Sequence, residues 1–369
     1  MKVLFLVNIP SPYRVDFFQE LGKLCELTVL YELKKASDRN DRWESSVLNK
    51  SYKEVYLKPV VKQASSAWCP SVTKYLGKQN YDIIVVGGYS TPTGIHAIRY
   101  LKRHKIPYLL NCDGGMIAHG ENILKKRLKT GMISGASAYL STGKAADEYL
   151  IYYGAEKPKI FHYPFTTLHE KDLLNEPVSQ NEKLVIRKKL EIEEEKMILS
   201  VGNFIPRKGF DILLRVAKDM DKQIGIYLVG GKETDEYRRI REELGLKNIH
   251  YIPFMNQEKL RGYYLSADIF VLPTREDIWG LVINEAMSMG LPVITTERCV
   301  AGVEMLESEC IVPVEQEEML SRKIMDFLDN PEILKEQAKR NLKKSRTYTI
   351  ENMAKVHYDI FTTFREADR

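Results

Sequence analysis

Residues 273–294 contain the side chains whose types and spacing are best suited to chemistry. The segment reads as a strand end, a loop, a helix over residues 281–289 and a second strand. Gly290 can supply the left-handed residue that caps this helix, and Pro292 prevents the helix from continuing.

The start of this helix offers a site for a phosphate or diphosphate, because the backbone N–H groups of Gly280, Leu281 and Val282 have no partner within the helix. Asp277 and Glu285 are eight residues apart, one in the loop and one a turn inside the helix. A carboxylate at either place can accept hydrogen bonds from sugar hydroxyls. A surface loop with a solvated acidic residue is the alternative interpretation of this spacing.

A second segment, residues 199–214, runs from a strand through a loop into an amphipathic helix. Its loop contains Gly202, Asn203, Arg207, Lys208 and Gly209. Arg207 and Lys208, at the carboxyl end of a strand, would face a cleft and can stabilise a departing diphosphate without a metal ion. An exposed basic turn is the alternative interpretation.

Together the two segments resemble the retaining glycosyltransferases of family 4, the glycosyl transferases group 1, which have the two-domain GT-B fold. The family signature is an acidic residue, seven other residues and Glu-Ala, with Gly-Leu inside it and Gly-x-Pro-Val-Ile after it. The matching residues are Gly280, Leu281, Glu285, Ala286, Gly290, Pro292, Val293 and Ile294. The family usually has Glu at the first acidic position, where this chain has Asp277 with Glu276 beside it.

The resemblance implies roles for these acidic residues. Glu285 would bind the nucleotide ribose, and Asp277 or Glu276 would contact the sugar of the donor. In this family the attack occurs on the face that the diphosphate leaves, so the anomeric configuration is retained. The diphosphate takes the acceptor proton, and neither a metal ion nor an organic cofactor is required.

The resemblance extends to the cationic loop. Lys208 and Gly209 match the Lys-Gly pair of the family, whereas Asn203 replaces a family arginine that follows a glycine matched by Gly202. We hypothesise that Arg207 supplies the missing charge.

Two further segments resemble donor-binding parts of the family. Residues 227–231, with Gly230, are similar to a strand and glycine turn near the donor. Phe254 and Met255 are similar to a segment that packs against the nucleotide base, and core packing is their alternative role.

The first half offers candidates for the acceptor side. Asp113 follows a strand, and by the resemblance it stands near the transferred sugar, where it can stabilise positive charge or bind hydroxyls; a turn-forming role before Gly-Gly is the alternative. Tyr13 and Arg14 occupy the turn after the first strand, where many relatives have paired glycines. Tyr89 and His119 complete the expected acceptor channel.

Strands and helices alternate along the chain, which is typical of parallel sheets with crossover helices. Strands are expected over residues 3–7, 27–30, 83–86, 108–110, 197–201, 225–229, 249–252, 269–272 and 293–295. Helices are expected over residues 15–24, 94–102, 281–289, 333–344 and 351–364. We expect an α/β protein with two doubly wound, Rossmann-like domains that face a cleft, with C-terminal helices packing back toward the first domain.

The expected boundaries follow from a polar break near residue 170. Residues 1–170 would form an acceptor-binding domain and residues 171–345 a nucleotide-sugar-binding domain. Residues 346–369 would form a helix that returns to the first domain.

The composition is that of an ordinary globular protein of 369 residues, with 44% hydrophobic and 28% charged residues. No apolar run approaches the ~20 residues that span a bilayer. The five scattered cysteines, without a C-x-x-C pair, indicate reduced thiols, no metal site and a cytoplasmic protein. The sequence has no Walker motif and no G-x-G-x-x-G after the first strand, which disfavours ATP hydrolysis and dinucleotide chemistry.

Charge is unevenly distributed. Residues 1–165 contain 24 Lys and Arg against 14 Asp and Glu, and the remainder contains 31 against 36. Within the basic half, the helix expected over Ile123–Ile133 mixes apolar residues with four cations. It can lie on an anionic membrane surface, and a solvated face over a core stripe is the alternative. No aromatic platform for nucleic acid accompanies it.

We therefore expect a hexosyltransferase that uses a nucleotide-sugar, most simply a UDP-sugar, and a glycan or lipid-linked acceptor. The expected setting is polysaccharide or lipopolysaccharide synthesis at the inner face of a bacterial membrane. A catalytically silent GT-B subunit that binds a partner glycosyltransferase is the main alternative. An epimerase or phosphorylase on a similar fold and a nucleic-acid-binding module are the others.

Overall fold

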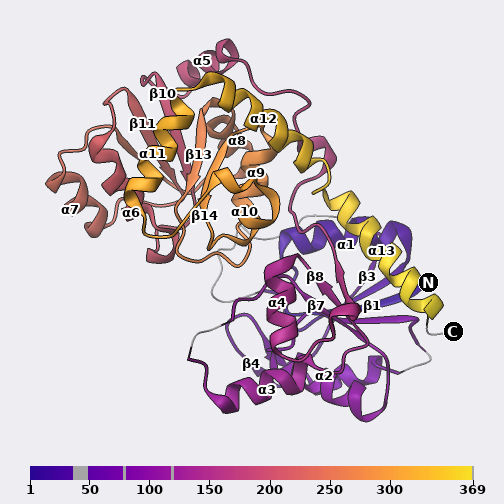
Figure 1. The fold of residues 1–369 in the computed structure, drawn as a ribbon. Coiled ribbons are helices and arrows are strands. Elements are labelled where there is room, and N and C mark those ends of the chain that lie inside the picture. The colour runs from indigo at the N-terminus through magenta and orange to yellow at the C-terminus, as the bar shows by residue number, and fades with distance from the viewer. Residues whose placement is uncertain (36–48, 78–79, 118–119, 368–369) are drawn as a thin grey trace. The chain divides into compact units, whose positions relative to one another are not determined.

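The computed structural model describes residues 1–35, 49–77, 80–117 and 120–367, which form two compact units (Figure 1). Unit 1 comprises residues 1–167 and 349–369, and unit 2 comprises residues 168–348. Each unit is built on its own parallel β-sheet covered by helices. The expected α/β class with two Rossmann-like units is confirmed.

The sheet of unit 1 has seven parallel strands in the order β3-β2-β1-β6-β7-β8-β9. The strands are β1 (Lys2–Val7), β2 (Glu26–Tyr31), β3 (Lys53–Tyr56), β6 (Ile83–Val86), β7 (Leu109–Cys112), β8 (Ala138–Ser141) and β9 (Ile160–His162). The central strands are continuous apolar runs because helices cover both faces of a parallel sheet. The order reverses between β1 and β6, the switch point at which ligands bind in such folds.

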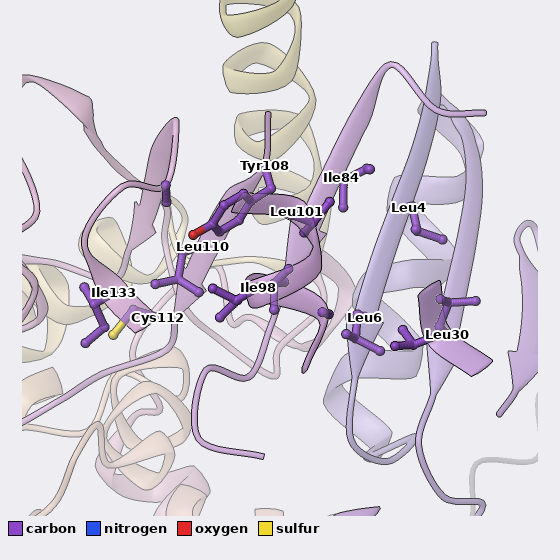
Figure 2. Packing of buried hydrophobic residues seen from close by; sticks show 14 of the residues in the cluster. Leu4, Leu6, Leu30, Ile84, Ile98, Leu101, Tyr108, Leu110, Cys112 and Ile133 are labelled. Atoms are coloured by element: carbon purple, nitrogen blue, oxygen red, sulfur yellow. The ribbon is translucent and has the colours of Figure 1, made fainter. Parts of the chain in front are cut away.

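The helices of unit 1 are α1 (Pro12–Leu24), α2 (Pro92–Arg103), α3 (Ile123–Ile133), α4 (Lys144–Tyr152) and α13 (Ile350–Ala367). Proline occupies the first turn of α1 and α2, where its missing N–H costs nothing. Figure 2 shows the apolar side chains of the sheet, among them Leu6 and Ile84, packing with Ile98 and Leu101 of α2. A short antiparallel hairpin, β4 (Val61–Lys62) and β5 (Ala67–Trp68), precedes β6.

The last helix, α13, belongs to unit 1, as the fold prediction required. It packs against α1 and buries His357 completely among aromatic rings. The ring centroids of Tyr163 and Phe17 lie 4.4 and 4.6 Å from that of His357. The apolar stripe of α13 therefore forms part of the core of unit 1, whereas α12 packs on α9 within unit 2.

The sheet of unit 2 has six parallel strands in the order β12-β11-β10-β13-β14-β15. The strands are β10 (Lys196–Val201), β11 (Ile224–Val229), β12 (Ile249–Ile252), β13 (Ile269–Leu272), β14 (Val293–Thr296) and β15 (Ile311–Val312). The helices are α5 (Gln180–Lys189), α6 (Phe210–Val216), α7 (Asp235–Glu243), α8 (Gln257–Ser266), α9 (Leu281–Ser288), α10 (Val300–Met305), α11 (Glu317–Leu328) and α12 (Pro331–Ser345). This is the Rossmann order, and its switch point lies between β10 and β13.

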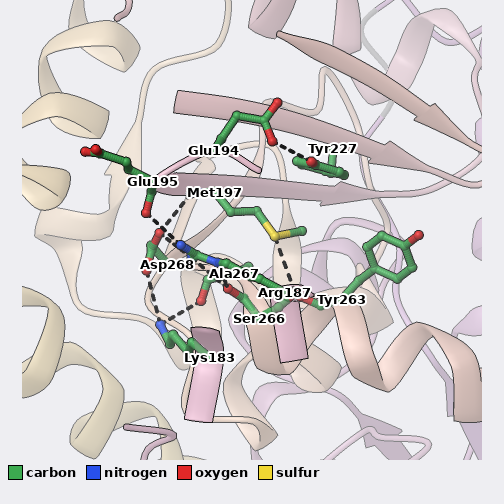
Figure 3. A network of polar contacts seen from close by, with 10 residues as sticks. All are labelled: Lys183, Arg187, Glu194, Glu195, Met197, Tyr227, Tyr263, Ser266, Ala267 and Asp268. Atoms are coloured by element: carbon green, nitrogen blue, oxygen red, sulfur yellow. Dashed lines mark hydrogen bonds and ion pairs between the residues drawn. The ribbon is translucent and has the colours of Figure 1, made fainter. Parts of the chain in front are cut away.

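A buried charge pair ties α5 to the amino ends of β10 and β13 (Figure 3). Arg187 Nη2 donates to Asp268 Oδ2 at 2.6 Å, and both side chains are less than 10% exposed. The guanidinium also donates to the carbonyl oxygens of Ser266 and Glu195, and Asp268 accepts the N–H of Met197 at 2.8 Å. Because the guanidinium and the carboxylate both have further hydrogen bonds, the pair orders the end of the sheet opposite the switch point.

Among the described residues, no helix is both long and apolar enough to cross a bilayer.

Candidate functional site

The loops that follow β10 and β13 meet at the switch point of unit 2. The loop after β10 contains a 3-10 turn, Pro206–Lys208, and then Gly209, whose φ is 69°. A Cβ atom on Gly209 would lie 1.9 Å from the carbonyl oxygen of Pro273, which follows β13. Only glycine allows this close approach together with a left-handed backbone, so Gly209 fixes the distance between the two loops.

Lys208 and Asp277 form an ion pair across these loops. Lys208 Nζ lies 2.5 Å from Asp277 Oδ2, and the two side chains are 10% and 13% exposed. The backbones are joined as well, because Thr274 Oγ1 and the N–H of Arg275 donate to the carbonyl oxygen of Arg207 at 2.8 and 2.7 Å. The pair is thus held rigidly at the carboxyl edge of the sheet.

Arg207 lies beside this pair and is half-exposed. Its Nη1 is 3.8 Å from Asp277 Oδ1 and donates to the carbonyl oxygen of Glu276 at 3.0 Å. The side chain of Glu276 is exposed. Of the two adjacent acidic residues, Asp277 therefore neutralises Lys208, and Glu276 has its carboxylate free to approach a ligand.

The helix α9 begins next to this ion pair. Gly280 precedes it with a φ of 97°, and no side chain caps the first turn. A Cβ atom on Gly280 would lie 2.7 Å from Cys299 Sγ. The N–H groups at the start of α9 carry the positive end of the helix dipole, so an anion can bind there. As predicted, Gly290 follows the helix in the left-handed region, with a φ of 65°.

Glu285 lies one turn inside α9 and is half-buried. Burial raises the pKa of Glu285, and hydrogen bonds from Tyr264 and Gln257 offset part of this rise. The Tyr264 hydroxyl, from α8, donates to Glu285 Oε2 at 2.8 Å. A ligand hydroxyl that reaches the carboxylate would find it oriented by Tyr264.

The remaining predicted donor residues of unit 2 follow β10, β11 and β12. Gly202 and Gly230 touch, because a Cβ atom on Gly230 would lie 2.3 Å from the carbonyl oxygen of Gly202. Asn203 is exposed. Phe254 is 54% exposed and Met255 half-buried, so core packing does not account for Phe254. Its ring is available to a planar ligand.

The switch point of unit 1 also has a charged cluster. Arg14, after β1, forms an ion pair with Asp113, after β7. Asn111 Nδ2 and the Tyr163 hydroxyl each donate to Asp113 Oδ1 at 2.6 Å. Burial opposes the charge of Arg14, but the Asp113 carboxylate raises its pKa overall. The carboxylate of Asp113 is 27% exposed, whereas the Arg14 side chain is 7% exposed.

The other acceptor candidates are placed less centrally. The Tyr13 ring packs edge-on against Phe165 with centroids 5.6 Å apart. The Tyr89 hydroxyl donates to that of Tyr149 at 2.8 Å. His119 lies outside the described residues.

Four residues that complete these clusters were not predicted from the sequence: Tyr264, Asn111, Tyr163 and Cys299. Tyr264 is 21 residues from Glu285 and Tyr163 is 50 residues from Asp113. No local spacing connects such pairs. Only the position of Asn111 at a strand end, two residues before Asp113, could have indicated its role.

The fold and the site can be compared with known proteins at this point. HepE from Anabaena, solved in complex with UDP, superposes with a TM-score of 0.80 at 14% identity, over 98% of this chain and 100% of that chain. A fold with two Rossmann-like units of this kind is the GT-B fold of glycosyltransferases.

Residues 182–345 match the family model of the glycosyl transferases group 1. This segment contains both switch-point loops of unit 2.

Curated relatives agree with this match. An uncharacterized glycosyltransferase of Haemophilus influenzae is 30% identical over 46% of this chain and 50% of its own length. The alpha-galactosylglucosyldiacylglycerol synthase of Streptococcus pneumoniae is 26% identical over 58% of each chain. The chain thus spans about half the length of the curated relatives it matches.

Proposed function

We propose that the protein is a retaining hexosyltransferase that uses a nucleotide-sugar, with UDP as the nucleotide. The observation that carries the proposal is the arrangement at the unit 2 switch point. There, an ion-paired lysine, an uncapped helix N-terminus and a half-buried carboxylate lie on two neighbouring loops and the helix that follows. Each is suited to a different part of a nucleoside diphosphate sugar. UDP in HepE, a protein of the same fold, supports the choice of nucleotide.

The diphosphate would bind between the two loops. Lys208 and Arg207 offer cationic N–H donors, and the N–H groups at Gly280 and the start of α9 offer neutral ones. As the glycosidic bond breaks, negative charge grows on the departing diphosphate, and fixed donors stabilise it without reorganisation. Asp277 holds Lys208 in place before the donor arrives.

The nucleoside and the sugar would occupy opposite sides of the diphosphate. Glu285 accepts hydrogen bonds from the ribose hydroxyls, and Phe254 with Met255 contacts the base. Glu276, whose carboxylate is exposed, is placed to accept hydrogen bonds from the hexose. In this proposal Glu276 is the acidic residue that contacts the hexose, and Asp277 is the one that holds Lys208.

The acceptor would bind in unit 1, near the partly exposed carboxylate of Asp113. In our proposal the acceptor oxygen forms a bond to the anomeric carbon on the face from which the diphosphate leaves, and its proton passes to a diphosphate oxygen. The anomeric configuration is then retained. Asp113 stabilises the positive charge that develops on the sugar ring.

We further propose that the acceptor is lipid-linked and that unit 1 approaches an anionic membrane surface through α3, in a step of bacterial surface-glycan synthesis. The exposed fractions of Ile123, Leu124 and Leu128 are 70%, 67% and 60%. These apolar side chains point to solvent. In the alternative interpretation, a solvated face over a core stripe, they would be buried against the core of unit 1. The pneumococcal relative, an alpha-galactosylglucosyldiacylglycerol synthase, supports the choice of a lipid acceptor.

The first experiment is a thermal shift panel with UDP, GDP, ADP and their common sugar conjugates, followed by release of the nucleotide. A ligand at about 100 times its dissociation constant adds about 2.7 kcal/mol of stability. We expect a selective shift with UDP compounds that is lost in Glu285→Ala and kept in Glu318→Ala, an exposed control on α11.

The outcome also separates the proposal from its main alternative. Slow hydrolysis of one UDP-sugar would support a transferase. A shift with no nucleotide in the panel would contradict the donor site and favour a silent subunit that binds a partner glycosyltransferase.

A further inference from the structure

The β4–β5 hairpin presents three apolar side chains to solvent. The exposed fractions of Val60, Val61 and Trp68 are 64%, 53% and 41%. Val61 and Trp68 are cross-strand partners, and the N–H of Val60 donates to the carbonyl oxygen of Trp68 at 2.9 Å. Val61 and Trp68 therefore lie side by side on one face of the hairpin, and Val60, which precedes β4, is an exposed apolar residue at its edge.

The opposite side of the hairpin is fixed to unit 1. The N–H of Ala67 donates to Glu32 Oε2 at 2.8 Å, and Thr93 Oγ1 donates to the carbonyl oxygen of Ala67 at 2.6 Å. Asn8 Nδ2 donates to the carbonyl oxygen of Ser65 at 3.0 Å. The hairpin is thus a rigid platform, close to the carboxyl end of β1.

The sequence around the hairpin is rich in cations. Residues 55–112 contain eight lysines and arginines and a single acidic residue, Asp82. Asp82 accepts the N–H of Lys2 at 2.7 Å and lies 3.2 Å from Arg365. Lys58 and Lys62, on either side of the valines, are exposed. Exposed apolar residues bordered by lysines complement the headgroups and upper acyl chains of an anionic bilayer.

The hairpin and α3 belong to the same region of unit 1. Both β5 and α3 contact α2, and Figure 1 shows β4, α2 and α3 together in this unit. On α3, Lys129 pairs with Glu121 at 2.6 Å and Lys126 lies over the Tyr152 ring. These two cations face the protein, and the apolar residues of α3 face away from it, as those of the hairpin do.

We propose that the β4–β5 hairpin is a second membrane-contact element, which inserts Trp68, Val60 and Val61 into the headgroup region of an anionic bilayer. The inference rests on the proposed function in one respect, because it assumes that α3 approaches the same surface. Trp68 acts as the interfacial anchor, because its ring is apolar and its indole N–H can bind lipid carbonyls. Two contacts fix the orientation of unit 1, which one helix alone cannot do.

Vesicle co-sedimentation tests the proposal, with phosphatidylcholine vesicles that contain or lack phosphatidylglycerol. We expect the wild type to bind the anionic vesicles only. Val60→Glu/Val61→Glu should reduce the partition coefficient at least about tenfold, because it removes apolar area and adds repulsion. Leu184→Glu/Val185→Glu is the matched control, because it also replaces two adjacent apolar residues by glutamate. These residues lie on α5 of unit 2 and are 58% and 56% exposed. Equal binding of the hairpin variant and the control would overturn the inference.

Brominated phospholipids give an independent readout. The measurement is made in a Trp43→Phe background, so that Trp68 and Trp279 are the tryptophans that remain. Trp68 in the headgroup region should be quenched by bromine near the top of the acyl chains, and Trp68→Phe should remove most of the quenching. Trp279 is buried, with 4% of its surface exposed, and should contribute little. Undiminished quenching in Trp68→Phe would contradict insertion of the hairpin.

The UDP-induced thermal shift separates this inference from the proposed function. A hairpin variant that loses vesicle binding but keeps both the wild-type circular dichroism spectrum and the UDP-induced shift is folded, and it supports the inference. Wild-type protein that shifts with UDP but ignores anionic vesicles overturns both membrane contacts and leaves the donor site standing. Loss of vesicle binding in Ile123→Glu/Leu124→Glu alone would assign the membrane contact to α3 and overturn the role of the hairpin.

Discussion

Lys208 and Asp277 are 69 residues apart in the sequence and 2.5 Å apart in the structure. The pair lies at the reversal point of the unit 2 sheet, where two neighbouring loops diverge and leave room for a ligand. Since both side chains are largely buried, each is the main ion-pair partner of the other. In our proposal Lys208 also contacts the departing diphosphate, so replacing it should change both the stability of the protein and its turnover.

Replacing Lys208 should therefore affect stability and turnover differently. Lys208→Ala leaves Asp277 with only the more distant guanidinium of Arg207, at 3.8 Å. The loss should cost about 1–3 kcal/mol of stability, and turnover should fall at least about 100-fold. Lys208→Ala/Asp277→Ala should recover most of the stability and none of the turnover. Urea unfolding and nucleotide release measure the two effects, with exposed Lys218→Ala as the control. Near-normal nucleotide release by Lys208→Ala would contradict the proposed role.

Glu285 should destabilise the folded protein at neutral pH, because its pKa is raised by burial. A carboxyl group with a raised folded-state pKa binds protons more tightly when folded, so stability falls as the pH rises through that pKa. Glu285→Gln should thus increase the melting temperature at pH 8 and leave it unchanged near pH 4. The same variant should lose the UDP-induced shift. Melting curves at both pH values check this, and an equal gain at pH 4 would refute the assigned cause.

At the level of elements, the contact between the two switch-point loops depends on a single glycine. Gly209 and Gly245 both have left-handed backbones, with φ values of 69° and 62°, but no atom lies within 4 Å of a Cβ built on Gly245. Gly245→Ala should cost about 1 kcal/mol of backbone strain. Gly209→Ala meets the carbonyl oxygen of Pro273 in addition, so it should cost at least about 3 kcal/mol and weaken UDP binding. Similar losses in the two variants would mean that the loops tolerate separation.

Elements could be predicted from the sequence where the signal is local. The apolar run of β6 predicted a buried parallel strand, and Gly290 with Pro292 predicted the end of α9. Two-residue strands such as β4 and β5 are too short to show a period, so the hairpin was missed. The partners within the site were missed for another reason. Pairs such as Arg14 with Asp113 and Tyr264 with Glu285 form only when segments that are distant in the sequence come together in the fold. A single sequence does not show which of its segments do so.

On the scale of the whole molecule, unit 1 is completed by a helix that follows unit 2 in the chain. α13 contributes His357 to the aromatic core around Phe17 and Tyr163. The Nδ1 atom of His357 lies 2.8 Å from the carbonyl oxygen of Met353. Burial lowers the pKa of His357 to about 4, from an ordinary value of 6.5. The nearby charges are Arg14, which also lowers it, and Asp113, which raises it.

Acid should therefore detach α13 from unit 1. When a histidine has a lowered folded-state pKa, the unfolded chain binds the proton more tightly, so stability falls as the pH drops from about 6.5 to about 4. The loss should reach about 3 kcal/mol for a shift of this size. His357→Phe keeps the ring and removes the charge, so its stability should decline less over this range. Urea unfolding at several pH values measures the difference, with exposed His104→Phe as the control; parallel curves for all three proteins would contradict the prediction.

Unit 2 should fold when residues 168–348 are expressed alone, because its sheet and helices all lie between these residues. We expect a cooperative melting curve and a UDP-induced shift.

Residues 1–167 alone should bind hydrophobic dyes, since the aromatic surface of α1 is uncovered, and a peptide of residues 349–369 should suppress that binding. Residues 1–167 that melt cooperatively without the peptide would show that α13 is dispensable.

The place of α13 also affects how the protein is made on the ribosome. The first 167 residues emerge with an incomplete core, and the 181 residues of unit 2 must be translated before α13 appears. At roughly 5–20 residues per second, this delay lasts roughly 10 to 40 seconds. During that time, the aromatic side chains of α1 are exposed to other nascent chains. Chaperones that shield such surfaces should then control the yield of this protein, and a premature stop codon just before Thr349 should be as damaging to unit 1 as one within it.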